Sequence, residues 1–263
     1  MFFDREKLTE HCERIGHFSA LKAIMVLEAL SYSSDHVSIA DISEITGLPA
    51  STTHRILQEL VDAGYASKDS ERKYRLGLDA MAMGMRMKAS NFLFEAAQSE
   101  MRRLNDVSGE TVHLVTLDRY QGIYIGKMEA KNQIGLKSRV GWNLPLYCTG
   151  TGKAILAHHP EEWLRDYFKF ELRRRFTEYT LTEEADIRQE LALIREQGYS
   201  LDKREHNNDV VCIAAPVFSS SGKVVCSIGI SAPDYRFSIE KALSFKEEVM
   251  ESAKAVSLKL KQV

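Results

Sequence analysis

The chain has 263 residues, a formal net charge of −2 at pH 7 and 44% hydrophobic residues, which is typical of a globular protein with one large or two modest domains. No apolar run reaches the length of a membrane span, and the charged N-terminus MFFDREKLTEHCER lacks a signal-peptide core. We therefore expect a cytoplasmic protein with no membrane partner. The four cysteines are scattered without a C-x-x-C motif, which argues against a disulfide framework or a structural zinc site. We expect no metal and no cofactor.

The N-terminal part of the chain predicts a charged leader followed by a helix. Residues 1–17 carry the leader. Ser19 can cap a helix that runs to about Ser31, and apolar residues lie almost all round this helix. That pattern predicts the buried first helix of a three-helix unit.

Residues 38–65, SIADISEITGLPASTTHRILQELVDAGY, predict two short helices joined by a tight turn. Ser38 can cap the first helix, with Asp41 reaching back in the pattern of a capping box. Gly47 supplies a flexible exit from that helix. Pro49 suits the first turn of the second helix, where its missing N–H costs nothing.

The second helix has one apolar face and one face of short polar, Arg and Gln side chains. At about 100° per residue, Thr53, Ile56, Leu57 and Leu60 share the apolar face. An ordinary amphipathic hairpin would show the same division. A major groove, however, favours the side chains of the other face, because Arg can read guanine, Gln adenine, and Ser or Thr phosphates or bases. The candidates for DNA contact on this helix are Ser51, Thr52, Arg55 and Gln58, with His54 at the border of the two faces.

A basic hairpin follows at YASKDSERKYRL, residues 65–76. The order helix, turn, helix and basic hairpin is that of a winged helix-turn-helix domain, which we place at residues 18–76. We assign Lys68, Arg72 and Lys73 of this wing to DNA contact. Residues 1–90 hold 11 Lys and Arg against 13 Asp and Glu, so the positive charge is local to the wing and the second helix. This balance predicts modest, salt-sensitive affinity per subunit for double-stranded DNA, with specificity gained by dimerisation on a palindromic operator.

Residues 77–91 predict a linker helix, rich in methionine over two of its faces. Because a single helix cannot bury methionines on opposite faces by itself, we expect it to pack against a second copy of the chain, as a homodimer or homotetramer.

From residue 92 to residue 263 the pattern predicts an α+β domain with an antiparallel sheet. A helix over Phe92–Val107 precedes strands at Thr111–Leu117 and 123–128, and Ile134–Ser138 is a candidate further strand. An amphipathic helix over Glu183–Gln197 leads to three more strands, at 199–202, 210–218 and 224–231. A closing helix is expected from Ser238 to about Leu260.

The loop and helix GWNLPLYCTGTGKAILAH, residues 141–158, form the second informative stretch. Backbone N–H groups clustered at a helix start can bind an anion. A nucleotide-binding P-loop fits poorly, because Tyr147 stands where its first glycine belongs and Ala154 where Ser or Thr is needed. We therefore expect a small carboxylate there. The basic run Arg173–Arg175 is interpreted as a solvated helix end rather than a nucleic-acid contact.

Taken together, these motifs resemble the IclR family of bacterial transcription regulators from about Phe18 to the C-terminus. The resemblance is carried by STTHRILQELVDAGY, KYRLG, SGETVHLVTL, LPLYCTGTGKAILA and IREQGYSLDKREH followed by VVCIAAPVF. It implies an N-terminal winged helix-turn-helix, a linker helix used in dimerisation and a C-terminal GAF/PAS-like domain that binds a small organic effector.

The resemblance also implies which residues bind the effector. They are Thr149, Gly150, Thr151, Gly152, Asp202, Cys212 and Ser231. Many members have Ala in place of Gly150 and Ser in place of Gly229, so we expect a roomier site that lacks one hydroxyl. Backbone amides at 149–152 suit a carboxylate and Asp202 can accept hydrogen bonds from hydroxyls, which together favour a sugar acid or a keto acid.

Three functions follow from these patterns. The first is a transcriptional regulator, expected to be a repressor of a catabolic operon controlled by a small organic acid. The second is an enzyme with an auxiliary winged helix, in which Cys148 or Cys212 would act with His113. For this enzyme the sequence offers neither a third residue to orient the histidine nor a nucleophile motif. His113 is interpreted instead as a satisfied core or edge histidine. The third is a DNA-binding protein whose C-terminal domain only oligomerises. We predict the first and no catalytic residues.

Overall fold

The computed structural model describes residues 19–32, 36–89, 92–131 and 135–261. The predicted leader lies outside these residues. The chain divides into two compact units, of which the first ends at Ser90 and the second begins at Asn91. None of the described helices is long and apolar enough to cross a membrane.

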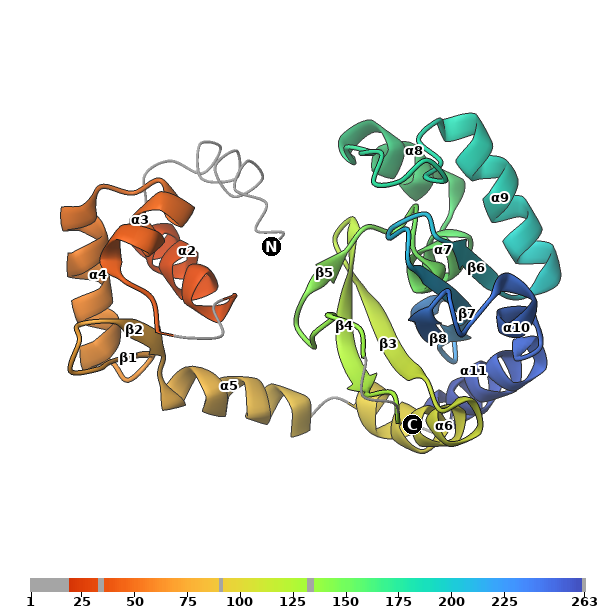
Figure 1. Cartoon of the computed structure of the whole chain (residues 1–263), viewed down its shortest axis with the longest axis horizontal. Helices are drawn as coiled ribbons and strands as arrows, with labels where there is room; N and C mark the ends of the chain where they lie inside the picture. Colours follow the sequence, from red (N-terminus) through yellow and green to blue (C-terminus); the bar gives the residue numbers. More distant parts are fainter. Residues whose placement is uncertain (1–18, 33–35, 90–91, 132–134, 262–263) are drawn as a thin grey trace. The chain divides into compact units, whose positions relative to one another are not determined.

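The first unit is a three-helix domain with a two-stranded wing, followed by a further helix (Figure 1). Its elements are α2 (Ser19–Ser31), α3 (Ile39–Thr46), α4 (Ala50–Asp62), β1 (Ala66–Lys68), β2 (Tyr74–Leu76) and α5 (Leu78–Ala89). The strands β1 and β2 pair antiparallel, with Ser67 opposite Arg75.

Local sequence signals determine how the helix-turn-helix folds. Ser38 and Asp41 form the predicted capping box, since the Asp41 N–H donates to Ser38 Oγ and the Ser38 N–H donates to Asp41 Oδ2. Gly47 ends α3 in the left-handed region, at φ 70°, which favours glycine. Pro49 is the N-cap of α4 rather than a residue of its first turn.

The core of the first unit lies between α2, α3, α4 and the wing. Val26, Ile42, Leu57 and Tyr74 are among its fully enclosed side chains. The expectation that α2 is buried all round is wrong, because 49% of the Ile24 surface is exposed. Only one apolar face of α2 packs into this core.

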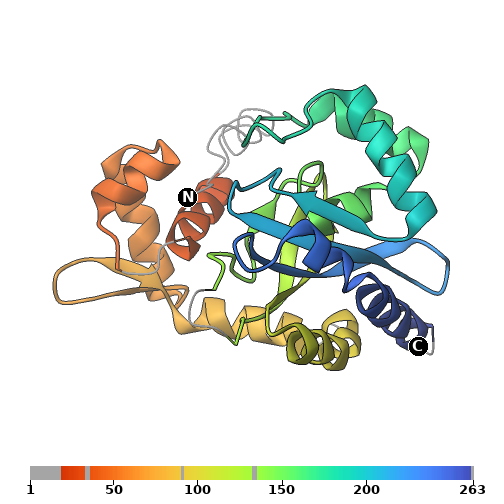
Figure 2. The same cartoon turned by 45° about the vertical axis from the view of Figure 1, so that its right-hand side comes forward.

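The second unit is a six-stranded antiparallel sheet with helices on both faces (Figure 2). The strand order is β5-β4-β3-β8-β7-β6. The strands are β3 (Thr111–Asp118), β4 (Gln121–Met128), β5 (Asn143–Leu144), β6 (Ser200–Lys203), β7 (Val210–Phe218) and β8 (Val224–Pro233). The helices are α6 (Phe92–Ser108), α7 (Gly150–Leu156), α8 (Glu161–Phe170), α9 (Glu184–Gln197), α10 (Ile239–Leu243) and α11 (Lys246–Leu260).

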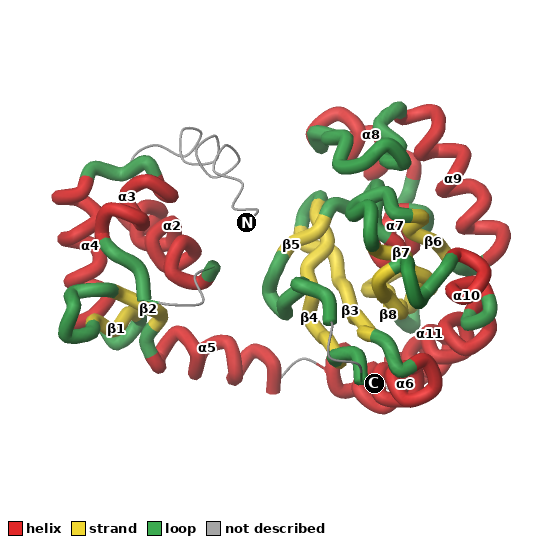
Figure 3. Tube along the Cα trace, in the orientation of Figure 1, coloured by secondary structure: helices red, strands yellow, loops and turns green. Residues whose placement is uncertain are grey.

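The two faces of the sheet pack against different helices (Figure 3). Alternate residues such as Ile213, Ile228 and Ile230 form the main apolar core with α6 and α11. The opposite face lies against α7, where Cys212 and Ala214 contact Ala154. Because strand side chains alternate between faces, the residues next to those of the main core point toward α7.

Three sequence expectations for the second unit are wrong. The closing helix is two helices, α10 and α11, separated at Ser244 and Phe245. Residues 135–138 form no strand, and Ile134 lies outside the described residues. The basic run is not a solvated helix end, because α8 ends at Phe170 and both Arg173 and Arg175 donate hydrogen bonds to backbone carbonyls, among them those of Phe168, Thr180 and Thr182.

Candidate functional site

Helix α4 presents the predicted polar face to solvent. Its packed side carries Thr53, Ile56, Leu57 and Leu60, all buried. The candidate contact residues on the other side are exposed or, for Thr52, half-buried: Ser51, Thr52, His54, Arg55 and Gln58. This arrangement suits a helix that enters a major groove.

Two of these residues are engaged within α4 in the absence of DNA. Arg55 Nη1 lies 2.8 Å from Glu59 Oε1, and Gln58 Nε2 lies 2.9 Å from Asp62 Oδ1. Both side chains of the Arg55–Glu59 pair are 60% exposed, so the pair contributes little to stability and can open at small cost. Any further partner of Arg55 or Gln58 would have to displace these acidic side chains.

The wing presents its cations around a well-ordered turn. Asp69 Oδ1 accepts hydrogen bonds from the N–H groups of Glu71 and Lys73, at 2.9 Å each, and this lowers the pKa of Asp69. Arg72 sits in the left-handed region at φ 63°, at the tip of the turn. Lys68, Arg72 and Lys73 are all exposed, although Lys73 Nζ also lies 3.0 Å from Glu71 Oε2.

The second candidate site is a row of buried polar side chains on the α7 face of the sheet. Strand register places Asp202 opposite Cys212, and Cys212 opposite Ser231. These three residues, predicted from the resemblance, are therefore direct neighbours on adjacent strands. All are at most 5% exposed. Apolar side chains normally fill such a position, so a buried polar row indicates a function beyond packing.

The row continues into Thr111, which the sequence did not single out, and into His113, which the sequence suggests as a core histidine or, in an enzyme, as the partner of a cysteine. Thr111 lies opposite Ser231, and its hydroxyl has no hydrogen-bond partner among the described residues. His113 Nδ1 lies 3.1 Å from Ser231 Oγ, and His113 Nε2 lies 2.7 Å from Ser138 Oγ. The His113 ring also packs against Tyr124, with centroids 4.7 Å apart. Only the sheet register could have revealed these neighbours.

The start of α7 packs directly on this row. Thr149 caps the helix: its hydroxyl accepts from the Gly152 N–H at 3.2 Å and donates to the Pro145 carbonyl at 2.7 Å. Ser200 and Ser227 donate to the carbonyls of Gly150 and Thr151. These bonds hold the first turn of α7 against β6 and β8.

Two expectations about this turn need correction. The Gly152 N–H is already bonded to the Thr149 hydroxyl, so this amide is not free to bind an anion as the sequence predicts. The site is also not roomier at Gly150 or Gly229. A Cβ at Gly150 would lie 2.8 Å from Cys212 Sγ, and one at Gly229 would lie 2.7 Å from Ala214 Cβ.

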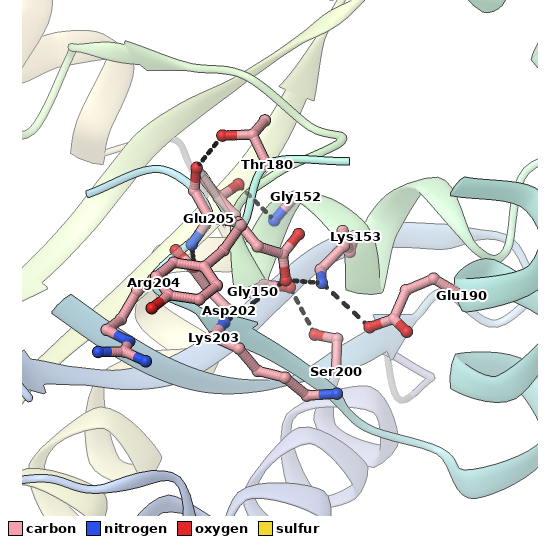
Figure 4. Close-up of polar contacts among 12 residues, drawn as sticks. Gly150, Gly152, Lys153, Thr180, Glu190, Ser200, Asp202, Lys203, Arg204 and Glu205 are labelled. Atoms are coloured by element: carbon pink, nitrogen blue, oxygen red, sulfur yellow. Dashed lines mark hydrogen bonds and ion pairs between the residues drawn. The ribbon is translucent and has the colours of Figure 1, made fainter. Parts of the chain in front are cut away.

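A buried ion cluster lies beside Asp202 (Figure 4). Lys153 is fully buried, and its ammonium lies 2.5 Å from Glu205 Oε1 and 3.0 Å from Glu190 Oε1. Burial alone disfavours a charged lysine, but these two carboxylates raise the pKa of Lys153. Glu205 Oε2 is buried without a hydrogen-bond partner in the described part of the chain.

Asp202 has a different environment from its neighbour Glu205. Its Oδ1 accepts a hydrogen bond from the Glu205 N–H at 2.6 Å. Burial, reinforced by the negative charge of Glu205, raises the pKa of the Asp202 carboxyl to about 8. At neutral pH this side chain is therefore mostly protonated, so it can donate a hydrogen bond as well as accept one.

The structure provides no nucleophile for the enzyme hypothesis. Burial raises the pKa of the Cys148 thiol, and that of Cys212 to about 12, so neither forms a thiolate at neutral pH. Burial lowers the pKa of His113 to about 3, and two serine hydroxyls already bond its ring. No cluster of His, Cys, Asp or Glu among residues 19–32, 36–89, 92–131 and 135–261 has the grouping of a metal site.

Comparisons with known proteins match both units. Residues 19–70 match the IclR helix-turn-helix domain, and residues 85–258 match the bacterial transcriptional regulator IclR C-terminal family. HTH-type transcriptional regulator KdgR of Escherichia coli is 32% identical over 243 residues, which cover 92% of each chain. HTH-type transcriptional repressor AllR of Salmonella typhimurium is 33% identical over 91% of this chain and 88% of its own.

A solved structure agrees with this assignment. The crystal structure of Thermotoga maritima IclR aligns with a TM-score of 0.76 and 28% identity over 92% of this chain and 98% of its own. The matched families and relatives are transcriptional regulators, which confirms the prediction that the chain is not an enzyme. Because family models match residues 19–70 and 85–258 and these relatives align over more than nine-tenths of it, the chain belongs to the IclR family of DNA-binding transcriptional regulators.

Proposed function

We propose that this regulator is a repressor of a catabolic operon, and that a small organic acid bound on the α7 face of the sheet controls its affinity for a palindromic operator. The protein acts in the cytoplasm, where its operator DNA is found. The repressor assignment is supported by the relative AllR, which is named a repressor and is 33% identical to this chain.

The row Asp202–Cys212–Ser231, continued by Thr111 and His113, is the observation that carries the effector site. Burying such groups without a ligand or partner costs free energy, and the Thr111 hydroxyl has no partner among the described residues. Each group offers or accepts a hydrogen bond, so the row suits a small polar molecule rather than an apolar one. We infer a sugar acid or a keto acid.

For DNA, the proposal assigns base reading to the exposed face of α4 and phosphate contact to the wing. The α4 residues are Ser51, Thr52, His54, Arg55 and Gln58, and the wing residues are Lys68, Arg72 and Lys73.

A palindromic operator requires a dimer, and helix α5 supports dimer formation. Its methionines Met81, Met83, Met85 and Met87 are each more than half exposed, which favours packing against a second copy.

A thermal-shift screen of the whole chain tests the effector proposal. Pyruvate and D-gluconate are compared with their neutral amides, pyruvamide and D-gluconamide. An acid present at about a hundred times its dissociation constant should raise the melting temperature by about 5–10 °C, and the matching amide by less. Selection of binding sequences from random duplexes should yield a palindromic operator. If none of these acids produces a shift, the C-terminal unit serves only for oligomerisation.

A further inference from the structure

Asp202 forms no ion pair of its own with the buried Lys153, whose charge only partly offsets the burial and the Glu205 charge that raise the Asp202 pKa. Lys153 is committed to Glu205 and Glu190, and the described residues contain no salt bridge to Asp202. The cluster therefore has one cation and three carboxyl groups (Figure 4). Because Glu205 and Glu190 both already contact the Lys153 ammonium, a further buried carboxylate beside them would lack a cation of its own.

The other groups that face Asp202 offer no positive charge either. Glu205 and His206 follow Asp202 in the chain, and Cys212 lies opposite it on β7. Two further groups are close enough to interact electrostatically with Asp202: Tyr124 on β4 and Cys148 before α7. Burial lowers the pKa of His206 and raises those of Tyr124, Cys148 and Cys212, so these groups are all neutral near pH 7. Apart from Lys153, which Glu205 and Glu190 share, an anionic ligand in this row would meet neutral hydrogen-bonding groups and the negative charge of Glu205.

We propose that Asp202 is held as a neutral carboxylic acid that donates its proton in a hydrogen bond to the effector's carboxylate, so that effector binding takes up a proton from alkaline solution. This inference rests on the proposed function, because it concerns the same site. A neutral Asp202 explains how a site without an unpaired cation can bind an organic acid in preference to a neutral molecule. An ionised Asp202 would repel a carboxylate and would favour a neutral, hydroxylated ligand instead.

The proposal sets the sign and the size of a pH effect. Asp202 titrates near pH 8 in the free protein, whereas a bound anion holds its proton more tightly. Affinity for an acid should therefore be constant up to about pH 7 and about tenfold weaker at pH 9. A site with an ionised Asp202 shows no such loss.

Calorimetric titration of the whole chain with pyruvate and with D-gluconate, from pH 6 to pH 9, tests this. Wild type should lose affinity about tenfold between pH 7 and pH 9. Asp202→Asn retains a neutral donor and should bind the same acid with no pH dependence. Asp202→Ala should bind weakly at every pH. His206→Gln is the control and should keep the wild-type pH profile.

A second measurement needs no ligand. The unfolded Asp202 titrates near its ordinary value, about 4, so between pH 4 and pH 8 the folded state holds a proton that the unfolded state has lost. Wild-type stability therefore falls with rising pH through this interval, relative to Asp202→Asn. The gap in melting temperature between the variant and wild type should widen from pH 6 to pH 8 and then level off.

The outcomes separate this inference from the proposed function. Binding of an acid that is unchanged or stronger at pH 9, or an equal pH dependence in Asp202→Asn, overturns the inference alone. A melting-temperature gap that stays constant from pH 6 to pH 8 does the same. No binding of either acid at any pH contradicts both.

Discussion

Gly150 and Gly152 show at the level of single residues why two positions in the first turn of α7 have no room for a side chain. A Cβ at Gly150 would meet the Cys212 thiol at 2.8 Å, and a Cβ at Gly152 would meet the Leu146 backbone at 2.6 Å. A thiol is a side chain that can be removed, whereas the Leu146 backbone is fixed by the fold. The two glycines are thus needed for different reasons.

This difference predicts a mutational pattern. Gly150→Ala should destabilise the protein by about 1–3 kcal/mol, as overpacking does, and Cys212→Ala should recover most of that loss. Gly152→Ala should cost more, and Cys212→Ala should not rescue it. Urea unfolding of the two single variants and both double variants measures this. Additive effects of Gly150→Ala and Cys212→Ala would mean that the two residues do not touch.

At the scale of elements, helix α4 has one face packed in the core and one exposed face whose positive charge is partly neutralised by acidic residues of the same helix. The pair Arg55–Glu59 joins residues one turn apart, and both partners are exposed. Such a pair is worth at most about 1 kcal/mol, so DNA can displace Glu59 from Arg55. Glu59 then remains as a negative charge near the phosphates.

We therefore predict opposite effects for the two partners. Arg55→Ala should cost about 1–3 kcal/mol at the specific operator and relax sequence preference, because Arg reads a base. Glu59→Gln should strengthen binding up to about fivefold, but only while Arg55 is present. Gel shifts on the selected operator and on a scrambled duplex provide the measurement.

The wing supplies the control for that experiment. Lys73→Ala should weaken both duplexes alike and flatten the salt dependence, since a phosphate contact carries no sequence information. Equal losses of Arg55→Ala on the two duplexes would contradict base reading by α4.

For the whole molecule, control of DNA binding requires that the effector bind two states of the protein unequally. Helix α5 follows the wing directly in the chain and precedes the second unit. Its exposed methionines can accept alternative packings against a partner copy, because Met is flexible. Two dimer arrangements can then differ by only a few kcal/mol.

Replacing Met81 and Met85 together with Leu tests this role of α5. Leu keeps the apolar volume but is less adaptable, so the substitution should change the coupling between effector and operator more than either separate affinity. Effector titrations with and without saturating operator, on wild type and the double variant, give both quantities. Unchanged coupling would place the switch in contacts between the C-terminal units.

The fold could be predicted further from sequence than the site could. The capping box at Ser38, the glycine at 47 and the alternating strands each have a local signal, and the structure has all of them except a strand at residues 135–138. The resemblance identified Asp202, Cys212 and Ser231, which adjacent strands bring together. Thr111 and Ser138 join them only through sheet register and a long-range hydrogen bond, which no local pattern encodes.

The chemistry of the site was harder to predict, because it depends on partners distant in sequence. The raised pKa of Asp202 follows from its burial and from the charge of Glu205, while Lys153, which acts against the rise, also bonds Glu190 and Glu205, 37 and 52 positions further along the chain. Likewise, the Thr149 hydroxyl occupies the Gly152 amide that seemed free. A sequence can predict which residues meet without showing how they bond.

The most direct test of the central claim is operator affinity with and without effector. Fluorescence anisotropy of the selected operator, titrated with protein in the absence and presence of a saturating acid from the thermal-shift screen, gives the two dissociation constants. We predict that they differ by about 5–150-fold, and that operator changes effector affinity by the same factor. The same operator affinity with the effector site empty and saturated would contradict control by the C-terminal unit.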